Sequence, residues 1–289
     1  MLVALNITLL VAAEPRSHLI GQRSAAAEPP HLIGQQRAAA EPRFHLIGLR
    51  RANGRARPYR INRRNTPVTD AILATNIAVY AVLRAPTSWS PRLFSLLAKS
   101  DAAIRRGAVH RFVTPVLLHG SLGHLLVNSL SLRNIGHMVE PYLGQERFIA
   151  VYVLSGIAGN SLSFYVGRSP LSVGASGAIF GLLGCWGTFL SVNSEFWARR
   201  GVHVGDSLSS LAGTFVINAA LGLQPGSRID NMGHLGGLFG GAAASFLIGP
   251  RLSQRRLPGG GTIIVDKPLV QMPRPDASQR ARKRPKGLS

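Results

Sequence analysis

The stretch SPLSVGASGAIFGLLGCWGTFLSVNS, residues 169–194, contains no Asp, Glu, Lys or Arg over a length sufficient to cross a bilayer as a helix. Four other stretches share this property: 112–132, 148–167, 207–227 and 231–250. A shorter uncharged stretch, 71–83, has flanking residues that could reach the membrane interface. They are rich in Gly, Ala and Ser, which allow helices to pack closely in lipid. The sequence therefore predicts an all-α integral membrane protein with six membrane-spanning helices.

Most of the net charge lies outside these stretches. The chain has 289 residues and a net charge of +21, yet 46% of its residues are hydrophobic. Residues 1–69 contain 11 Arg and 3 Glu, and residues 251–289 contain 10 Lys or Arg and 2 Asp. We therefore expect disordered basic tails at 1–69 and 251–289 around a membrane domain at 70–250. A nucleic-acid-binding protein would carry its basic residues along a folded face, so the lipid bilayer is the expected partner and nucleic acid is not.

An even number of spans places both basic tails on one side of the membrane, in agreement with the positive-inside rule. One loop conflicts with this arrangement, because it is basic and lies on the opposite side. Its apolar residues 93–98 suggest a segment that lies in the membrane interface. The loop, 84–111, contains one acid, Asp101, against six basic residues: Arg84, Arg92, Lys99, Arg105, Arg106 and Arg111.

The N-terminal region contains a tandem repeat whose three copies begin at Ala12, Ala26 and Ala39. The copies are short and interrupted by Pro, which favours a disordered extension over a repeat fold. The extension is rich in Arg and contains no Lys, a composition compatible with an organelle transit peptide. Cys185 is the single cysteine, so the chain forms no intramolecular disulfide.

Polar side chains within membrane spans are costly and tend to mark functional sites. His124 and Asn128 are four residues apart and share one face of a helix. Ser176 and His234 lie near the starts of two spans that run in the same direction, so we expect them at a similar depth. This is a geometry for a serine activated by a histidine. Small residues four apart allow close contact of the two helices: Gly177 and Gly181, Gly236 and Gly240, and Gly237 and Gly241.

Three motifs occur in the order found in a known family: HGSLGHLLVN at 119–128, GASGAIFG at 174–181 and DNMGHLGG at 230–237. They resemble the rhomboid intramembrane serine proteases, over about residues 70–252. The resemblance implies a six-helix rhomboid-type bundle in which Ser176 is the nucleophile and His234 the general base. It also implies that His124, Asn128 and the Ser176 N–H stabilise the oxyanion, and that Gly174 shapes the loop before the nucleophile. No metal or other cofactor is implied.

Two positions depart from the family pattern. Many members carry a Trp-Arg pair before the second span, whereas this chain has His110-Arg111. Some bacterial members place a tyrosine four residues after the nucleophile, where it stacks on the catalytic histidine. Phe180 occupies that position here, so we expect stacking without a hydroxyl hydrogen bond.

The leading hypothesis is a serine endopeptidase that cleaves single-span membrane proteins within the membrane. The first alternative is a catalytically silent relative that binds or escorts membrane proteins, although such relatives typically lack the Ser or the His. The second is a small transporter, which would need an ionisable path that the spans do not offer. The core and its continuation through 249–268 look most like plant plastid rhomboids. We therefore expect the plastid inner envelope, with the mitochondrion second.

Overall fold

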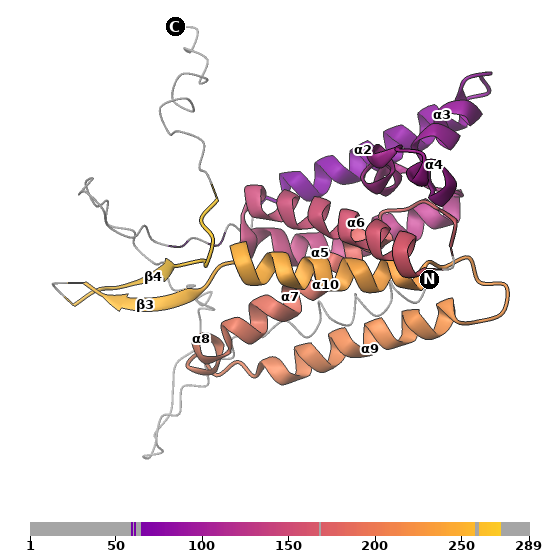
Figure 1. Ribbon diagram of the computed structural model, residues 1–289. Coiled ribbons are helices and arrows are strands. Elements are labelled where there is room, and N and C mark those ends of the chain that lie inside the picture. Colours follow the sequence, from indigo (N-terminus) through magenta and orange to yellow (C-terminus); the bar gives the residue numbers. More distant parts are fainter. Residues whose placement is uncertain (1–58, 60, 62–64, 168, 258–259, 273–289) are drawn as a thin grey trace, which may run out of the picture.

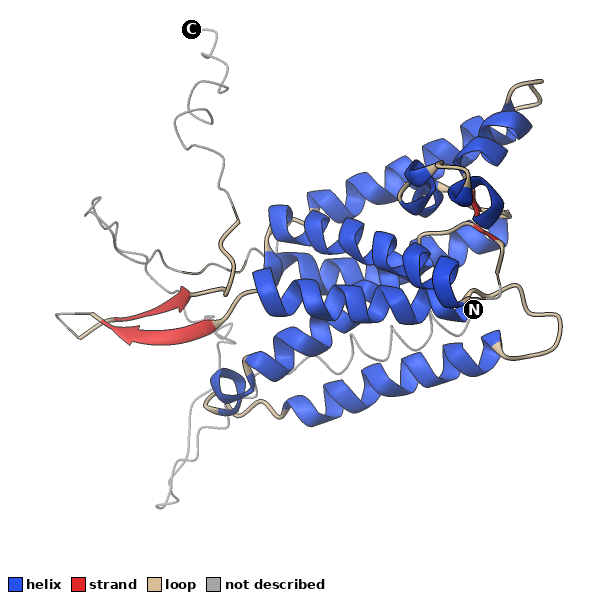
Figure 2. Cartoon of the chain, viewed as in Figure 1, coloured by secondary structure: helices blue, strands red, loops and turns tan. Residues whose placement is uncertain are grey.

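The computed structural model describes residues 59, 61, 65–167, 169–257 and 260–272. This part of the chain is mostly helical, with two short antiparallel strand pairs (Figures 1 and 2). The predictions for the N-terminal repeats and for residues 273–289 lie outside it. The elements are, in chain order, α2 (Pro67–Arg84), α3 (Ser90–Leu97), β1 (Lys99–Ser100), α4 (Asp101–Arg105), η1 (Val109–Phe112), η2 (Thr114–Leu117), α5 (Leu122–Leu143), α6 (Gln145–Val166), β2 (Leu171–Ser172), α7 (Ser176–Val192), α8 (Ser194–Ala198), α9 (Val204–Gly222), α10 (Asn231–Ile248), β3 (Leu252–Arg256) and β4 (Thr262–Asp266).

Helix α10 forms the centre of the bundle with α6 and α7 (Figure 1). It packs along both of these helices, which also contact each other. Helix α5 contacts α2, α6 and α7, whereas α9 contacts the bundle mainly through α7 and α8. Because the expected serine and histidine lie on α7 and α10, the most closely packed helices of the protein also position the candidate site.

Among the described residues, six helices have 17 to 22 residues, and each overlaps one of the six expected spans. Two of them, Gln145–Tyr165 and Val204–Gly222, are long and apolar enough to cross a membrane by length and composition, and Ser176–Val192 is apolar but shorter. In the most apolar 18-residue stretch of α9, 17% is buried inside the structure, against 39% in that of α6. Most of the apolar surface of α9 is therefore available to lipid.

The expected span at 112–132 is shifted in the structure. Residues before Ser121 form the turns η1 and η2, and the Ser121 hydroxyl starts α5 by accepting a hydrogen bond from the His124 N–H at 3.2 Å. The helix then continues to Leu143 and includes Arg133 and Glu140. The absence of charge was therefore a wrong guide to where this helix begins and ends.

Glu140 is 2% exposed and holds the start of α2. One carboxylate oxygen accepts a hydrogen bond from the Val68 N–H at 3.1 Å, and the other accepts bonds from the Thr69 N–H and hydroxyl at 2.8 and 2.7 Å. The first N–H groups of a helix have no hydrogen-bond acceptor within the helix. Here a carboxylate from α5 accepts their hydrogen bonds. This cap fixes α2 against α5.

The prediction of a disordered tail at 251–289 is wrong for residues 252–256 and 262–266, which pair as the antiparallel strands β3 and β4. Asp266 anchors the hairpin, because it accepts hydrogen bonds from the Arg147 side chain at 2.5 Å and the Arg251 N–H at 3.0 Å. The N–H of Tyr59 donates to Ile264 O at 2.7 Å. Burial raises the pKa of Tyr59, so its hydroxyl remains a donor to the α5 carbonyl of residue 142, at 2.5 Å. Tail residues whose charges suggested disorder are thus bound to the bundle.

The basic loop 84–111 folds into the short helices α3 and α4 and the turn η1. Arg111 is 8% exposed and donates to Ser95 O and Ala98 O, at 2.7 and 2.5 Å. His110 Nε2 lies 3.1 Å from Leu96 O. The His110-Arg111 pair therefore joins η1 to α3.

Candidate active site

Ser176 is the first residue of α7, and the loop before it has an unusual backbone. Gly174 has a φ of 136°, which residues with a Cβ rarely adopt. Its N–H donates to Pro115 O at 2.9 Å and ties the loop to η2. A Cβ at position 174 would lie 2.8 Å from both Cε1 and Nε2 of His124 and 3.7 Å from Ser176 Oγ. The loop, the His124 ring and the Ser176 hydroxyl therefore meet at Gly174.

His234 lies in the first turn of α10, at the same end of the packed α7–α10 pair as Ser176. A Cβ at Gly177 would lie 3.2 Å from Gly233 O, so the neighbours of the serine and the histidine are in contact. The His234 ring stacks on Phe180, with centroids 4.2 Å apart and planes 20° apart. The expected stacking by Phe180 is confirmed, and it fixes the plane of the imidazole beside α7.

No hydrogen bond joins Ser176 to His234 among the described residues, and the buried Nδ1 of His234 has no partner there. Ser176 is only half-buried, whereas His234 is 9% exposed. Catalytic hydrogen bonds are often long before substrate binds and shorten in the complex. The arrangement places the two residues at the same end of the packed α7–α10 pair, and their catalytic roles remain predictions.

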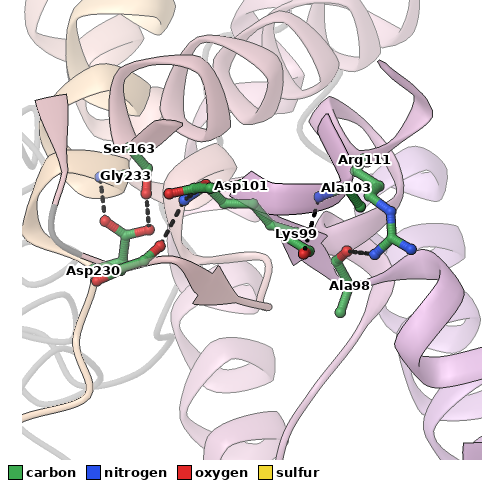
Figure 3. Close-up of polar contacts among 10 residues, drawn as sticks. Ala98, Lys99, Asp101, Ala103, Arg111, Ser163, Asp230 and Gly233 are labelled. Atoms are coloured by element: carbon green, nitrogen blue, oxygen red, sulfur yellow. Dashed lines mark hydrogen bonds and ion pairs between the residues drawn. The ribbon is translucent and has the colours of Figure 1, made fainter. Parts of the chain in front are cut away.

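Asp230 sets the start of α10 and thereby the height of His234. Its Oδ1 accepts a hydrogen bond from the Gly233 N–H at 2.9 Å, and its Oδ2 accepts one from the Ser163 hydroxyl of α6 (Figure 3). Aspartate is a favoured residue at a helix N-terminus for this reason. Asp230 therefore has a structural role, consistent with its omission from the expected dyad.

Glycines make the close approach of α7 and α10 possible. A Cβ at Gly237 would overlap Gly177 O, and one at Gly241 would overlap Gly181 O. The other expected pair faces a different helix, because a Cβ at Gly236 would lie 2.6 Å from the carbonyl oxygen of residue 158 on α6. The predicted contact through Gly237 and Gly241 is confirmed, whereas Gly236 and Gly240 pack against α6. One helix thus approaches two neighbours through two separate rows of glycine.

The residues expected to stabilise an oxyanion lie on the first turns of α5. Asn128 is 5% exposed, and its Nδ2 donates to His124 O of the preceding turn at 2.8 Å. The His124 ring contacts His119 edge to face, with centroids 5.3 Å apart. His119 is 2% exposed, in agreement with the structural role predicted for it near the helix entrance. Among the residues that the structure describes, no group of three or more His, Cys, Asp or Glu could hold a metal ion.

Lys99 holds the loop before Ser176, although the sequence motifs do not include it. Its side chain is fully buried, and Nζ donates to Ser169 O at 2.7 Å and pairs with Asp101 at 2.8 Å (Figure 3). The strands β1 and β2 pair beside this contact, with Lys99 opposite Ser172. Lys99 is the first lysine of the chain and follows many arginines. This is the one feature of the sequence that could have drawn attention to it.

Together, the bundle and the site define a helical membrane protein with a serine and a histidine at one end of two closely packed helices. A model of the Rhomboid domain matches residues 106–251, which is about half of the chain. The chain belongs to the rhomboid family.

Its relatives include bacterial and plant proteins. Rhomboid protease GluP of Bacillus subtilis (strain 168) is 38% identical over 152 residues, which are 53% of this chain and 28% of GluP. RHOMBOID-like protein 1 of Arabidopsis thaliana is 37% identical over 162 residues, 54% of this chain and 40% of the relative. The protein YdcA of Bacillus subtilis (strain 168) is 35% identical over 184 residues, 63% of this chain and 88% of the relative. The chain therefore spans less than half the length of the first two relatives and most of the third.

Proposed function

We propose that this protein is an intramembrane serine endopeptidase in which Ser176 is the nucleophile and His234 the general base. The observation that carries the proposal is the position of Ser176 on α7 beside the stacked His234 of α10, with Gly174 joining the serine loop to His124. Family membership and a relative named as a protease support it.

In this mechanism Ser176 Oγ attacks the carbonyl carbon of a substrate peptide bond while the His234 imidazole accepts the hydroxyl proton. The resulting oxyanion is bound by the Ser176 N–H and by the side chains of His124 and Asn128. His234 then transfers the proton to the leaving amine, and water attacks the acyl-enzyme ester in a second half-reaction. Loss of one oxyanion donor in a serine protease raises the activation free energy by on the order of 2.7 to 4 kcal/mol. Removal of any one of these donors should therefore lower the cleavage rate measurably.

The membrane arrangement is part of the proposal. The helices α2, α5, α6, α7, α9 and α10 cross the bilayer within a protease domain at 70–250. A substrate helix must unwind locally before its peptide bond can reach Ser176, so we expect single-span membrane proteins with small or helix-breaking residues near the cut. The basic region 1–69 is proposed as an extension outside this domain that acts as a transit peptide.

For the compartment, the relatives do not distinguish one organelle from another, since they include bacterial proteins and an Arabidopsis protein named as mitochondrial. The plastid inner envelope, with the mitochondrion second, remains a hypothesis from the sequence. Imaging of the full chain fused to a fluorescent protein in plant cells, beside markers for both organelles, distinguishes the two.

The test of the activity is cleavage of a single-span reporter by the purified full chain in lipid vesicles. Ser176→Ala and His234→Ala are each expected to abolish cleavage. Ser191→Ala, on the same helix, and His203→Ala, before α9, are matched controls that should retain it. If the parent cuts no reporter of a panel and Ser176 resists a serine-reactive phosphonate, the protein is instead a silent relative that binds membrane proteins.

A further inference from the structure

The basic loop 84–111 is not used by the proposed peptidase mechanism, and part of it lines a cavity. The cavity has a volume of about 910 Å³ and lies between the C-terminal end of α2, the helices α3 and α4, and strand β2. Three arginines line it, Arg84, Arg106 and Arg111, together with several Ser and Thr side chains and no Asp or Glu. An uncompensated cluster of this kind favours an anion.

Hydrogen bonds anchor two of the three arginines, and all three have N–H donors that remain available. Arg84 lies over the Tyr80 ring and donates through Nη2 to Gly120 O. Arg111 is anchored to two carbonyls through Nη1, while its buried Nε has no hydrogen-bond partner among the described residues. The Arg106 side chain makes no hydrogen bond or ion pair with any described residue and is exposed. Since a guanidinium carries five N–H donors, hydrogen bonds remain available to a bound group.

The lining of the cavity is also partly apolar, because it includes Leu83, Phe94, Leu171 and Val173. Further hydrophobic side chains are exposed on the same loop, just after it and at the first turn of α5, with exposed fractions of 46% to 66% for Trp89, Leu96, Val109, Val113 and Leu122. The cavity lies at the ends of α2 and α5, where a membrane domain meets the polar headgroups. Arginines at this level contact lipid phosphates, whereas apolar side chains beside them contact acyl chains.

We propose that this cavity binds the phosphate headgroup of an anionic phospholipid, whose acyl chains lie over the exposed apolar side chains of the loop. A free anion would use the arginines alone and would leave the apolar side chains of the cavity lining and of the loop without a role. The proposal also accounts for a basic loop on the side of the membrane opposite the basic tails. It rests on the membrane location of the rhomboid domain and not on the peptidase activity.

The experiment compares lipid retention by the full chain and by two charge-matched variants. The cavity variant is Arg84→Gln with Arg106→Gln, and the control is Arg92→Gln with Arg105→Gln, two exposed arginines of the same loop that do not line the cavity. Each protein is reconstituted in phosphatidylcholine with increasing phosphatidylglycerol, and bound lipid is counted by native mass spectrometry. Thermal unfolding in pure phosphatidylcholine verifies that all variants are folded.

We expect the cavity variant to lose affinity for phosphatidylglycerol by on the order of tenfold or more, because two charge contacts are removed. The control should stay within about twofold of the parent, and Arg84→Lys with Arg106→Lys should keep most of the binding. Equal loss in cavity and control variants would show general charge attraction and overturn the proposal. Equal binding of soluble glycerol phosphate would show a free-anion site and also overturn it. A cavity variant that keeps phosphatidylglycerol but no longer cleaves reporters with an acidic residue near the cut would assign the cavity to substrate.

Discussion

Alanine at Gly237 is expected to force apart the two helices that carry Ser176 and His234. Its Cβ would lie 2.7 Å from Gly177 C and 3.1 Å from Gly177 Cα, and closer still to Gly177 O. These are backbone atoms that cannot rotate away, so we take the upper end of the overpacking cost, about 3 kcal/mol. Alanine returns about 1 kcal/mol through its helix propensity. The free energy of unfolding should therefore fall by about 2 kcal/mol.

Gly213→Ala is the matched control, because Gly213 lies within α9 and a Cβ there would have no atom within 4 Å. It should be neutral or stabilising by up to about 1 kcal/mol, so the two variants should differ by about 2 to 3 kcal/mol. Unfolding in mixed micelles with increasing SDS measures the stability, and the rate of Ser176 labelling by a phosphonate measures the site. Gly237→Ala should also slow labelling. If it is as stable as the parent, or if Gly213→Ala loses as much, the close packing of α7 and α10 does not position the site.

Two further substitutions test contacts that lie outside the three motifs. Glu140→Ala should lower the free energy of unfolding by about 3 kcal/mol, because Val68 and Thr69 lose a charged acceptor. Glu140→Gln should lower the stability less. If the alanine variant is as stable as the parent in the SDS titration, Glu140 does not cap α2. Lys99→Met should slow phosphonate labelling of the folded protein by about tenfold or more, because the loop at Ser169 loses its anchor. Lys99→Arg should recover part of the rate, and a change in stability alone, with unchanged labelling, would show that Lys99 only supports the fold.

The long helices, and the expected common depth of Ser176 and His234, could be predicted from the local pattern of charged and apolar residues. Uncharged stretches predicted the approximate positions of the long helices other than α5, and equal depth of Ser176 and His234 is expected from the direction of their helices. Phe180 was expected to stack because it occupies the position at which some members of the family carry a stacking tyrosine, and it was found against His234. Periodicity and chain direction are properties of a segment, so a single sequence contains them.

Contacts between distant segments were harder to predict. Glu140 is charged and therefore seemed to lie outside a span, yet α2 supplies its partners from 71 or more positions earlier. The amide of Asn218 lies within a span and donates to Thr214 O of its own helix at 2.7 Å. Asn160 does bond outside its helix, to Phe112 O at 2.8 Å. A polar side chain in a span has several possible acceptors, and the tertiary packing selects one of them.

The hairpin at β3 and β4 has a practical consequence for the smallest fragment that could be purified. A fragment cut to the matched Rhomboid domain, 106–251, would leave Arg147 without its Asp266 partner and would remove all of α2. The chain before α2 and the chain after α10 meet at Tyr59 and Ile264. The stable unit therefore extends past both limits of the recognised domain, and its two ends lie close enough for a short linker to join them.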